Sequence, residues 1–569
     1  MQGFARSRQF DLTPTFHDHR RVLSVREWLL LSLAVVPLYF VSLGRHSSLD
    51  GHEILVAQTA REMLESGEWI VPHFSGEIRL QKPPLAYWLT AGTFASTGRV
   101  DEFVARLPVA IATLAQIALL AWFGARCFGA PVGLTTGILH ATTFWTVRFG
   151  KSALVDNVLV TLVVAAIVWS TFDRLLPIRN RHRWVITFWI WCGLSVLAKG
   201  PVGLAVIVPT VILYRSTRGR HRDDVPLFFT WTTVAGLMVF SLLSIGWPAL
   251  VLAREPEAAR LWYEQSVGRF LEHWGPNTRP WYYYCYQIPL LTLPWSPLWI
   301  TEWIRTARNR GMPAQELEAS GLRQEYRLLW IWSGVAFLFF SFSEGKREHY
   351  VLPGLPPLSL LAAMGLLHWK AIWQAPLERI ASAISPPRWT VAVLLIAAGG
   401  LASFVGYPSP FAQTGVFAIV LAIGLAGREA VAWTRANHSS PAGLRFFLCV
   451  SVAWILADSL VVPAFARRTE TLALFERHRE LLKAAERVVQ YGSNDRWAIF
   501  PLNRRMAWPR TTAELKQLVE SSPRTLLLVP RKRVEEVRGV VAFELVEDVE
   551  SASEDSSQQL VLLRPRTWR

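Results

Sequence analysis

Side chains that can transfer protons or bind anions are few in the long apolar part of this chain, and they gather in loops that we place on one side of it. These residues are Asp50, His52, Glu53, Lys82, Asp156, Lys199, His273, Lys346 and Tyr350. A bilayer penalises ionisable groups, so polar residues kept at its surface indicate a functional site. Carboxylates and histidines can accept or orient a proton, and lysines can stabilise a developing negative charge. We therefore expect these residues to share one pocket.

The composition indicates a membrane protein. Hydrophobic residues make up 51% of the chain and charged residues 18%, which is less charge than a soluble protein of this size usually carries. The 27 tryptophans fit the aromatic belts of membrane interfaces. The net charge of +16 lies mainly in short loops between apolar spans, as in cytoplasmic loops, so we expect no nucleic-acid partner. The four cysteines show no disulfide or zinc-site spacing.

Apolar runs that can cross a bilayer recur up to residue 464. A spanning helix needs about 20 apolar residues. We place thirteen spans, near 27–44, 104–124, 131–149, 153–172, 184–198, 201–214, 227–253, 283–303, 328–343, 350–368, 389–407, 411–433 and 446–464. If the basic segment 1–26 is cytoplasmic, the arginine-rich loop at 173–183 and the basic loop at 304–327 also fall inside. This pattern predicts a cytoplasmic N-terminus and an external C-terminus.

Two stretches of the first outer loop, residues 45–103, are expected to lie along the membrane surface. Residues 84–98 are apolar, but counting them as a span would put the arginine-rich loops outside. Residues 52–66 have the apolar spacing of an amphipathic helix that ends at Gly67. Such a helix lies in the membrane plane, although a packed helix of an outer soluble domain would show the same pattern.

The composition changes after residue 464. A charged amphipathic pattern at 470–490 predicts a helix, and the spacing of Thr511 and Glu514 predicts the start of another. Short apolar runs predict strands at Trp497–Phe500, Thr525–Val529, Val540–Val546 and Leu560–Leu563. The predicted parts are a cytoplasmic tail at 1–26, a catalytic membrane domain at 27–464 with outer loops at 45–103 and 254–282, and a small soluble periplasmic α/β domain at 465–569.

Short motifs follow one another in order between residues 50 and 353. The first of them are Asp50-Gly51-His52-Glu53, Ala60-Arg61-Glu62-Met63-Leu64, Lys82-Pro83-Pro84-Leu85 and Arg106-Leu107-Pro108. The later ones are Asp156, Leu197-Ala198-Lys199-Gly200-Pro201, His273, Pro294-Trp295 and Gly345-Lys346 through Tyr350-Val351-Leu352-Pro353. This ordered set resembles the integral-membrane GT-C glycosyltransferases, in particular the lipid A aminoarabinose transferases and the dolichyl-phosphate-mannose protein mannosyltransferases.

The resemblance implies an α-helical polytopic membrane protein of the GT-C type, with about thirteen transmembrane helices, in a bacterial inner membrane. Such a protein moves a sugar from a polyprenyl-phosphate donor to a lipid A-like, glycan or protein acceptor at the outer face, with inversion at the anomeric carbon. The resemblance implies that the donor contacts Lys82, Lys199, Lys346, Tyr350 and His273. It implies catalytic roles for Asp50, His52, Glu53 and Asp156.

The start of the 52–66 helix departs from the pattern of that family. Many relatives have an adjacent Asp-Glu pair here, whereas counting back from Arg61 aligns Glu53 with the glutamate and His52 with the aspartate. Either Asp50 supplies the missing carboxylate, or His52 replaces it as a base near neutral pH. Asp50 would equally suit the role of a helix cap.

Gln81 is a second departure. The aminoarabinose transferases tend to have a glutamate before Lys-Pro-Pro, where it helps to bind a divalent metal together with the histidine that His273 matches. Because glutamine is a poor ligand for such an ion, a metal cofactor is in doubt. His52, Glu53 and His273 are a substitute ligand set, and the alternative is that His273 forms hydrogen bonds with the donor or the acceptor.

Other interpretations of these residues remain open. Lys82 can be a lysine that snorkels from the start of a helix, and Asp156 can be a structural partner of Arg148 or Lys151. A transporter or flippase of polyprenyl-linked sugars would share the spans and the cations. Transporters, however, often show inverted repeats with polar residues at the bilayer midplane. The polar residues of this chain cluster on one side, which favours an enzyme.

Overall fold

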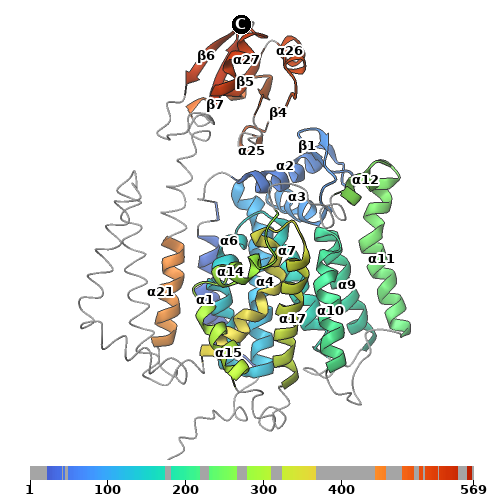
Figure 1. Ribbon diagram of the computed structural model, residues 1–569, viewed down its shortest axis with the longest axis vertical. Coiled ribbons are helices and arrows are strands. Elements are labelled where there is room, and N and C mark those ends of the chain that lie inside the picture. Colours follow the sequence, from blue (N-terminus) through green and yellow to red (C-terminus); the bar gives the residue numbers. More distant parts are fainter. Residues whose placement is uncertain are drawn as a thin grey trace, which may run out of the picture.

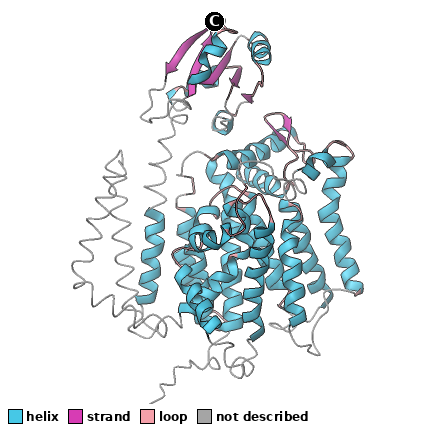
Figure 2. Ribbon diagram, in the orientation of Figure 1, coloured by secondary structure: helices cyan, strands magenta, loops and turns pink. Residues whose placement is uncertain are grey.

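The structure, a computed structural model, consists of a helical bundle and a smaller part that contains a β-sheet (Figure 1). It describes residues 22–41, 43–44, 49–172, 181–217, 230–264, 278–308, 323–366, 442–456, 477–492, 499–503, 506–522, 524–548 and 560–566. Figure 2 shows that helices make up the bundle and that most strands lie in the part nearest the C-terminus.

The helices of the bundle follow the apolar runs of the sequence. They are α1 (Val25–Phe40), α4 (Glu102–Phe128), α5 (Ala130–Thr142), α6 (Phe144–Phe149), α7 (Val155–Trp169), α9 (Arg181–Lys199), α10 (Val202–Thr217), α11 (Trp231–Leu252), α12 (Ala258–Tyr263), α14 (Tyr283–Leu291), α15 (Ser296–Arg308), α17 (Arg323–Phe342), the 3-10 helix η3 (Glu348–Gly354) and α21 (Ala442–Leu456). Helices occupy the predicted spans as far as the described residues extend, and the predicted spans at 389–407 and 411–433 lie outside them.

The predicted spans at 131–149 and 283–303 each divide into two α-helices. The run at 131–149 divides into α5 and α6 at Thr143, whose ψ of 138° is extended. The run at 283–303 divides into α14 and α15, and the break contains Pro294, which has no backbone N–H to donate. An apolar run indicates burial or lipid contact, but it does not locate such breaks.

Within the described ranges, α4 and α11 are each long and apolar enough to cross a bilayer. The helix η3 and the following helix Pro356–Leu366 meet at 65°, and they would form a third crossing if counted as one broken span. On α11, the apolar side chains of Met238 and Leu242 are 67% and 72% exposed. An apolar surface of this kind suits contact with lipid.

A chain of polar side chains lies inside the apolar core. The Nε2 atom of His140 in α5 is 2.8 Å from Nε2 of Gln116 in α4, and its Nδ1 atom is 2.9 Å from Oγ of Ser359. Thr161 of α7 donates to Oε1 of Gln116 at 3.0 Å. His140 and Gln116 are completely buried. Because buried polar groups are costly without partners, these bonds fix how the helices pack.

The variant His140→Leu is expected to lower the free energy of unfolding by about 2–3 kcal/mol, because it leaves Gln116 and Ser359 buried without this partner. Thermal unfolding of the purified protein in detergent would measure the change. The double variant His140→Leu/Ser359→Ala should recover part of the loss, since it removes one of the unpaired groups. A loss below about 0.5 kcal/mol for the single variant would contradict a structural role for this network.

Two short helices cover one end of the bundle. Helix α2 spans Gly51–Ser66 and α3 spans Leu85–Thr97, and both lie across this end (Figure 1). Helix α2 forms where the apolar spacing predicts a helix, and α3 forms in the apolar stretch 84–98. Helix α2 ends at Gly67, whose φ of 70° lies in the left-handed region that favours glycine. Between the two helices is a hairpin of β1 (His73–Phe74) and β2 (Glu77–Ile78).

The C-terminal part contains a five-stranded mixed sheet in the order β4-β3-β5-β7-β6. Strands β4, β3 and β5 are parallel, whereas β7 is antiparallel to β5 and to β6. The strands are β3 (Arg487–Gln490), β4 (Met506–Ala507), β5 (Thr525–Pro530), β6 (Phe543–Asp548) and β7 (Leu560–Pro565). The helices are α24 (Arg479–Ala484), α25 (Ile499–Leu502), α26 (Thr512–Glu520), η5 (Arg531–Arg533) and α27 (Val534–Arg538).

Some details of this part differ from the prediction. Among the described residues of the helix expected at 470–490, Arg477 and α24 are helical, whereas the β-branched pair Val488 and Val489 lies in strand β3. Residues 499–502 form helix α25 where the sequence predicts the end of a strand. The predicted start of α26 is confirmed, because the side chain of Thr511 accepts a hydrogen bond from the Glu514 N–H.

Candidate functional site

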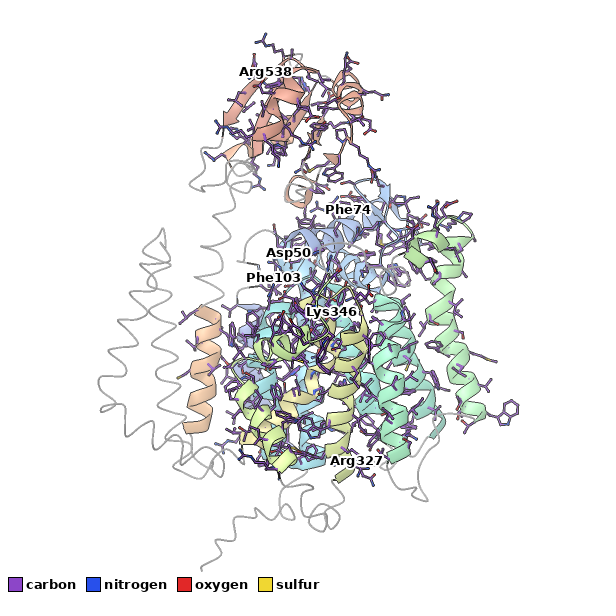
Figure 3. All side chains as sticks on the ribbon, viewed as in Figure 1. Asp50, Phe74, Phe103, Arg327, Lys346 and Arg538 are labelled. Atoms are coloured by element: carbon purple, nitrogen blue, oxygen red, sulfur yellow. The ribbon has the colours of Figure 1, made fainter. Side chains whose placement is uncertain are left out.

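The described polar residues that the sequence singles out, which are all of them but His273, lie at the end of the bundle that α2 and α3 cover. Figure 3 labels Asp50 and Lys346 near this end and Arg327 near the opposite one. Four more of these residues lie in or beside helices. Lys82 is shortly before α3, Asp156 is in the first turn of α7, Lys199 is at the end of α9, and Tyr350 is in η3. Separate helices therefore bring together residues that are far apart in the sequence.

A buried ion pair lies within this group. Lys199 Nζ donates a hydrogen bond to Asp156 Oδ1, and the two side chains are 11% and 12% exposed. Lys199 also lies over the ring of Tyr350, with 5.1 Å between Nζ and the ring centroid. The ammonium group thus contacts a carboxylate and an aromatic face, and both contacts stabilise a cation away from bulk water.

The partners that the sequence offers for Asp156 are engaged elsewhere. Arg148 forms an ion pair with Glu348 at 2.8 Å. Lys151 donates to a backbone carbonyl of α1 at 3.2 Å. The observed partner, Lys199, lies 43 residues from Asp156 in the sequence, so this pairing depends on the packing of α7 against α9.

Two further basic side chains face the ion pair. The charges of Lys82 and His349 both act on Asp156, which places these residues at the same site. The ring of His349 packs edge-on against Tyr350, with 5.1 Å between centroids, and tilted against Phe149, with 6.2 Å between centroids. His349 is not among the residues predicted from the sequence, although its position directly before Tyr350 is a signal that could have found it.

The first turn of α2 holds Asp50 in a structural contact. Its Oδ1 atom accepts hydrogen bonds from the backbone N–H groups of His52, at 2.7 Å, and of Glu53, at 2.8 Å. Glu53 accepts in return from the Asp50 N–H at 3.0 Å, which completes a capping box. Asp50 therefore has the helix-cap contacts that the sequence leaves as one of its alternatives.

Glu53 is only 3% exposed. It accepts hydrogen bonds from Nε and Nη2 of Arg106, both at 2.8 Å, and from the backbone N–H of Ala153 at 2.7 Å. Burial raises the pKa of Glu53, but Arg106 and the backbone N–H groups outweigh burial and hold this pKa below its usual value. Both carboxylate oxygens are occupied, so these contacts make Glu53 an anchor of α2 on α4 and on the segment before α7.

His52 differs from its neighbour Glu53 in being exposed. It interacts electrostatically with Asp50 and with His349, which places His52 near the residues of η3. Of the two residues that align with the Asp-Glu pair of the family, His52 is thus the accessible one.

Lys346 has backbone partners at this site. Its Nζ atom donates to the carbonyl of Arg279 at 3.1 Å and to that of Ser343 at 2.5 Å. The two loops that carry these carbonyls also pair through an isolated β-bridge. Lys346 therefore ties the loops together. His273 lies outside the described residues.

The side chains at the start of α2 do not favour the binding of a metal ion. Within the described ranges, no three histidine, cysteine, aspartate or glutamate side chains converge as ligands. Gln81, at the position of the family glutamate, is exposed. Glu53, a member of the substitute ligand set, already uses both oxygens for Arg106 and backbone N–H groups. Glu53 therefore does not fit the role of a metal ligand.

Comparison with known proteins shows which glycosyltransferases this chain is similar to. Residues 81–247 match the model of the dolichyl-phosphate-mannose-protein mannosyltransferase family. The undecaprenyl phosphate-alpha-4-amino-4-deoxy-L-arabinose arabinosyl transferase of Edwardsiella ictaluri is 27% identical over 68% of this chain, and that of Pseudomonas fluorescens is 28% identical over 61%. The crystal structure of ArnT from Cupriavidus metallidurans bound to undecaprenyl phosphate shares the fold, with a TM-score of 0.70, 19% identity and coverage of 95% of this chain and 98% of that one.

The chain is thus similar to this mannosyltransferase family and to the arabinosyl transferases, and it shares the fold of ArnT. The alignments with the two sequence relatives span 66% and 59% of their own lengths, which is less than two thirds. The segment that matches the family model, 81–247, contains Lys82, Asp156 and Lys199. The similarity to this GT-C family thus includes the part of the chain that forms the ion pair.

Proposed function

We propose that this chain is a glycosyltransferase that moves a pentose or hexose from a polyprenyl-phosphate donor to a lipid A-like, glycan or protein acceptor. The buried pair of Lys199 and Asp156, with Lys82 and Tyr350 beside it, carries this proposal, because it provides cations for a phosphate at one end of an ArnT-like bundle. The names of the sequence relatives support 4-amino-4-deoxy-L-arabinose as the sugar and undecaprenyl phosphate as its carrier.

The proposed reaction forms a bond between an acceptor oxygen and the anomeric carbon and breaks the bond from that carbon to the phosphate oxygen. The bonding electrons leave with the polyprenyl phosphate, and Lys82 and Lys199 stabilise the negative charge that develops there. The proton of the acceptor hydroxyl goes to a base. The exposure of His52 supports this residue as the base, with the Asp50 carboxylate as the alternative. Attack from the side opposite the phosphate inverts the anomeric centre.

We also propose an orientation in a bacterial inner membrane, with the site at the outer face, the N-terminus in the cytoplasm and the C-terminal sheet in the periplasm. Basic residues support it, because they mark helix ends on the far side of the bundle, where cytoplasmic loops are enriched in arginine and lysine. They are Arg183, Arg215, Arg305, Arg308 and Arg327. Thirteen spans, of which two fall outside the described residues, would place the two termini on opposite sides.

Lys82→Ala is expected to lower kcat/KM for sugar transfer by about 10²- to 10³-fold, because it removes a charge that stabilises the leaving phosphate. The assay uses the purified protein in detergent with a labelled undecaprenyl-phosphate sugar and lipid A. Lys532→Ala is the matched control, since Lys532 is an exposed lysine of η5 in the C-terminal sheet, and it should transfer like the wild type.

A transporter gives a different result in the same assay. A flippase would show no transfer in detergent even as the wild-type chain, and it would move the lipid-linked sugar across the membrane of a proteoliposome. If Lys82→Ala instead transferred sugar as fast as Lys532→Ala, the assignment of Lys82 to the donor phosphate would be wrong.

A further inference from the structure

Arg61 of α2 contacts the C-terminal part of the chain. It is 7% exposed, and its Nη1 atom donates to the backbone carbonyl of Phe500 at 2.8 Å and to Oδ1 of Asn503 at 3.1 Å. Within α2, the same atom donates to Oε1 of Gln58 at 3.3 Å. The guanidinium carbon also lies 4.2 Å from the centroid of the Phe500 ring.

Other side chains reinforce this contact between the two parts. Asn503 Nδ2 donates to Oε1 of Glu65 at 3.3 Å, and the rings of Phe94 and Phe500 stack with 6.4 Å between centroids. Apolar residues of α2, α3 and the C-terminal sheet share one buried cluster. Figure 1 shows α25 next to α2. The C-terminal sheet is therefore packed on the helix that carries His52.

A guanidinium group is a specific choice for this position. Apolar side chains alone would hold two surfaces together, and buried charges are often no more stabilising than apolar residues of similar size. A planar guanidinium, however, forms directional hydrogen bonds and stacks on an aromatic ring at the same time. The contacts of Arg61 with Phe500 and Asn503 therefore fix the rotation and height of α2 against the sheet, in addition to holding them together.

Helix α2 transmits this constraint to the site. Glu53 anchors the first turn on Arg106, and Arg61 lies eight residues further on, roughly 12 Å along the axis. The helix is thus held at one end by the bundle and at the other by the C-terminal sheet. His52 is next to Glu53, so a tilt of α2 would move it. A shift of about 1 Å at a reacting group can lower the rate about 100-fold.

We propose that Arg61 is a positioning residue for the transfer reaction and that, through it, the C-terminal sheet sets the place of His52 relative to the ion pair of Lys199 and Asp156. This inference rests on the proposed glycosyltransferase function. The sheet then takes part in the reaction without supplying a group that touches the donor. Loss of the Arg61 contact should therefore slow the reaction of bound substrates and leave donor binding nearly unchanged.

The test compares kcat with the KM for the undecaprenyl-phosphate sugar in purified wild-type and variant proteins. Arg61→Ala should lower kcat about tenfold, with a change in donor KM of less than about threefold. The kcat of Arg61→Lys should fall between that of the wild type and that of Arg61→Ala, because lysine keeps a hydrogen-bond donor but lacks the planar guanidinium group. Arg99→Ala removes an exposed arginine at the same end of the bundle, paired with Asp101, and should match the wild type.

A second variant approaches the contact from the C-terminal side. Asn503 has a φ of 48°, which glycine adopts easily, so Asn503→Gly removes the amide group without straining the backbone. It should lower kcat by less than Arg61→Ala. The double variant should lose less than the two single losses combined, because both changes remove the bond between Arg61 and Asn503, while Asn503→Gly alone also removes the bond to Glu65.

Rates are expressed per folded molecule, with thermal unfolding in detergent as the measure of folding. A wild-type kcat in folded Arg61→Ala would overturn the inference while the transferase function stood, and so would a loss that the folded fraction explains. Absence of transfer by the wild-type chain would overturn the proposed function, and this inference with it. A rise in the KM for the sugar donor as large as the expected fall in kcat would assign Arg61 to donor binding and contradict a positioning role.

Discussion

Asp156→Asn should lower kcat/KM for sugar transfer about 1,000-fold and leave the protein folded. Asparagine keeps the shape of the side chain but removes the charge that pairs with Lys199, and this pair holds the ammonium group over Tyr350. Without the carboxylate, Lys199 and Lys82 are two like charges at one site with no fixed position for either. Steady-state transfer by purified protein in detergent measures the loss.

Glu68→Gln is the matched control for this experiment. Glu68 pairs with Arg254 at 2.9 Å, but the two side chains are 32% and 48% exposed, so the pair contributes little. Its loss should leave transfer within about threefold of the wild type. Retention of more than a tenth of the wild-type kcat/KM by Asp156→Asn would show that the ion pair is structural and would remove it from the reaction.

Glu53→Ala is expected to destabilise the protein by about 3–5 kcal/mol, because it leaves the guanidinium group of Arg106 buried without its carboxylate. His52→Ala should instead leave the unfolding temperature unchanged and lower kcat, since the His52 side chain is exposed. Thermal unfolding in detergent, run on both variants beside the transfer assay, separates the two roles. A Glu53→Ala protein that unfolds like the wild type but is inactive would make Glu53 a catalytic residue and contradict its assignment as an anchor.

The same contact predicts how stability depends on pH. The folded-state pKa of Glu53 is held below its usual value, so folding favours the ionised carboxylate. This contribution is complete above the unfolded pKa of a glutamate, about 4.3, and is lost as the pH falls through the lower folded value. Glu53→Gln should therefore flatten the acid side of the stability profile relative to the wild type.

The positions of the helices and several contacts of the site follow from local patterns in the sequence. Apolar periodicity locates α2, the apolar composition of residues 84–98 locates α3, and Gly67 marks the end of α2. The lone carboxylate of Asp156 inside an apolar run and the break after Lys199 both point to the ends of helices. Each of these signals lies within a few residues of the feature that it predicts.

The pairings across the bundle do not follow from such patterns. Asp156 has basic residues closer in sequence than Lys199, and Glu53 has no spacing rule that connects it to Arg106, 53 residues away. Which of these ions meet depends on how the helices pack, and helix packing is a long-range property. For the same reason, the contact of Arg61 with Phe500 is invisible before the C-terminal sheet is placed on α2.

In the C-terminal part, the local sequence pattern itself predicts the wrong secondary structure at some positions. Its strands are short, and Ile499 and Phe500, at the end of a predicted strand, lie in helix α25, because a few apolar residues fit a buried helix turn as well as a strand. The strand at β3 lies inside a stretch whose charges resemble an amphipathic helix. Here the tertiary contacts of Val488 and Val489 in the sheet decide the structure over the local pattern.

A structure of the protein in lipid nanodiscs with undecaprenyl phosphate, determined by electron cryo-microscopy, tests the central claim most directly. We expect density for the phosphate beside Tyr350, within ion-pair distance of the amino groups of Lys82 and Lys199, and the prenyl chain along the bilayer-facing side of the bundle. Phosphate density at the opposite end, near Arg327, or at a place that neither lysine reaches would contradict the account.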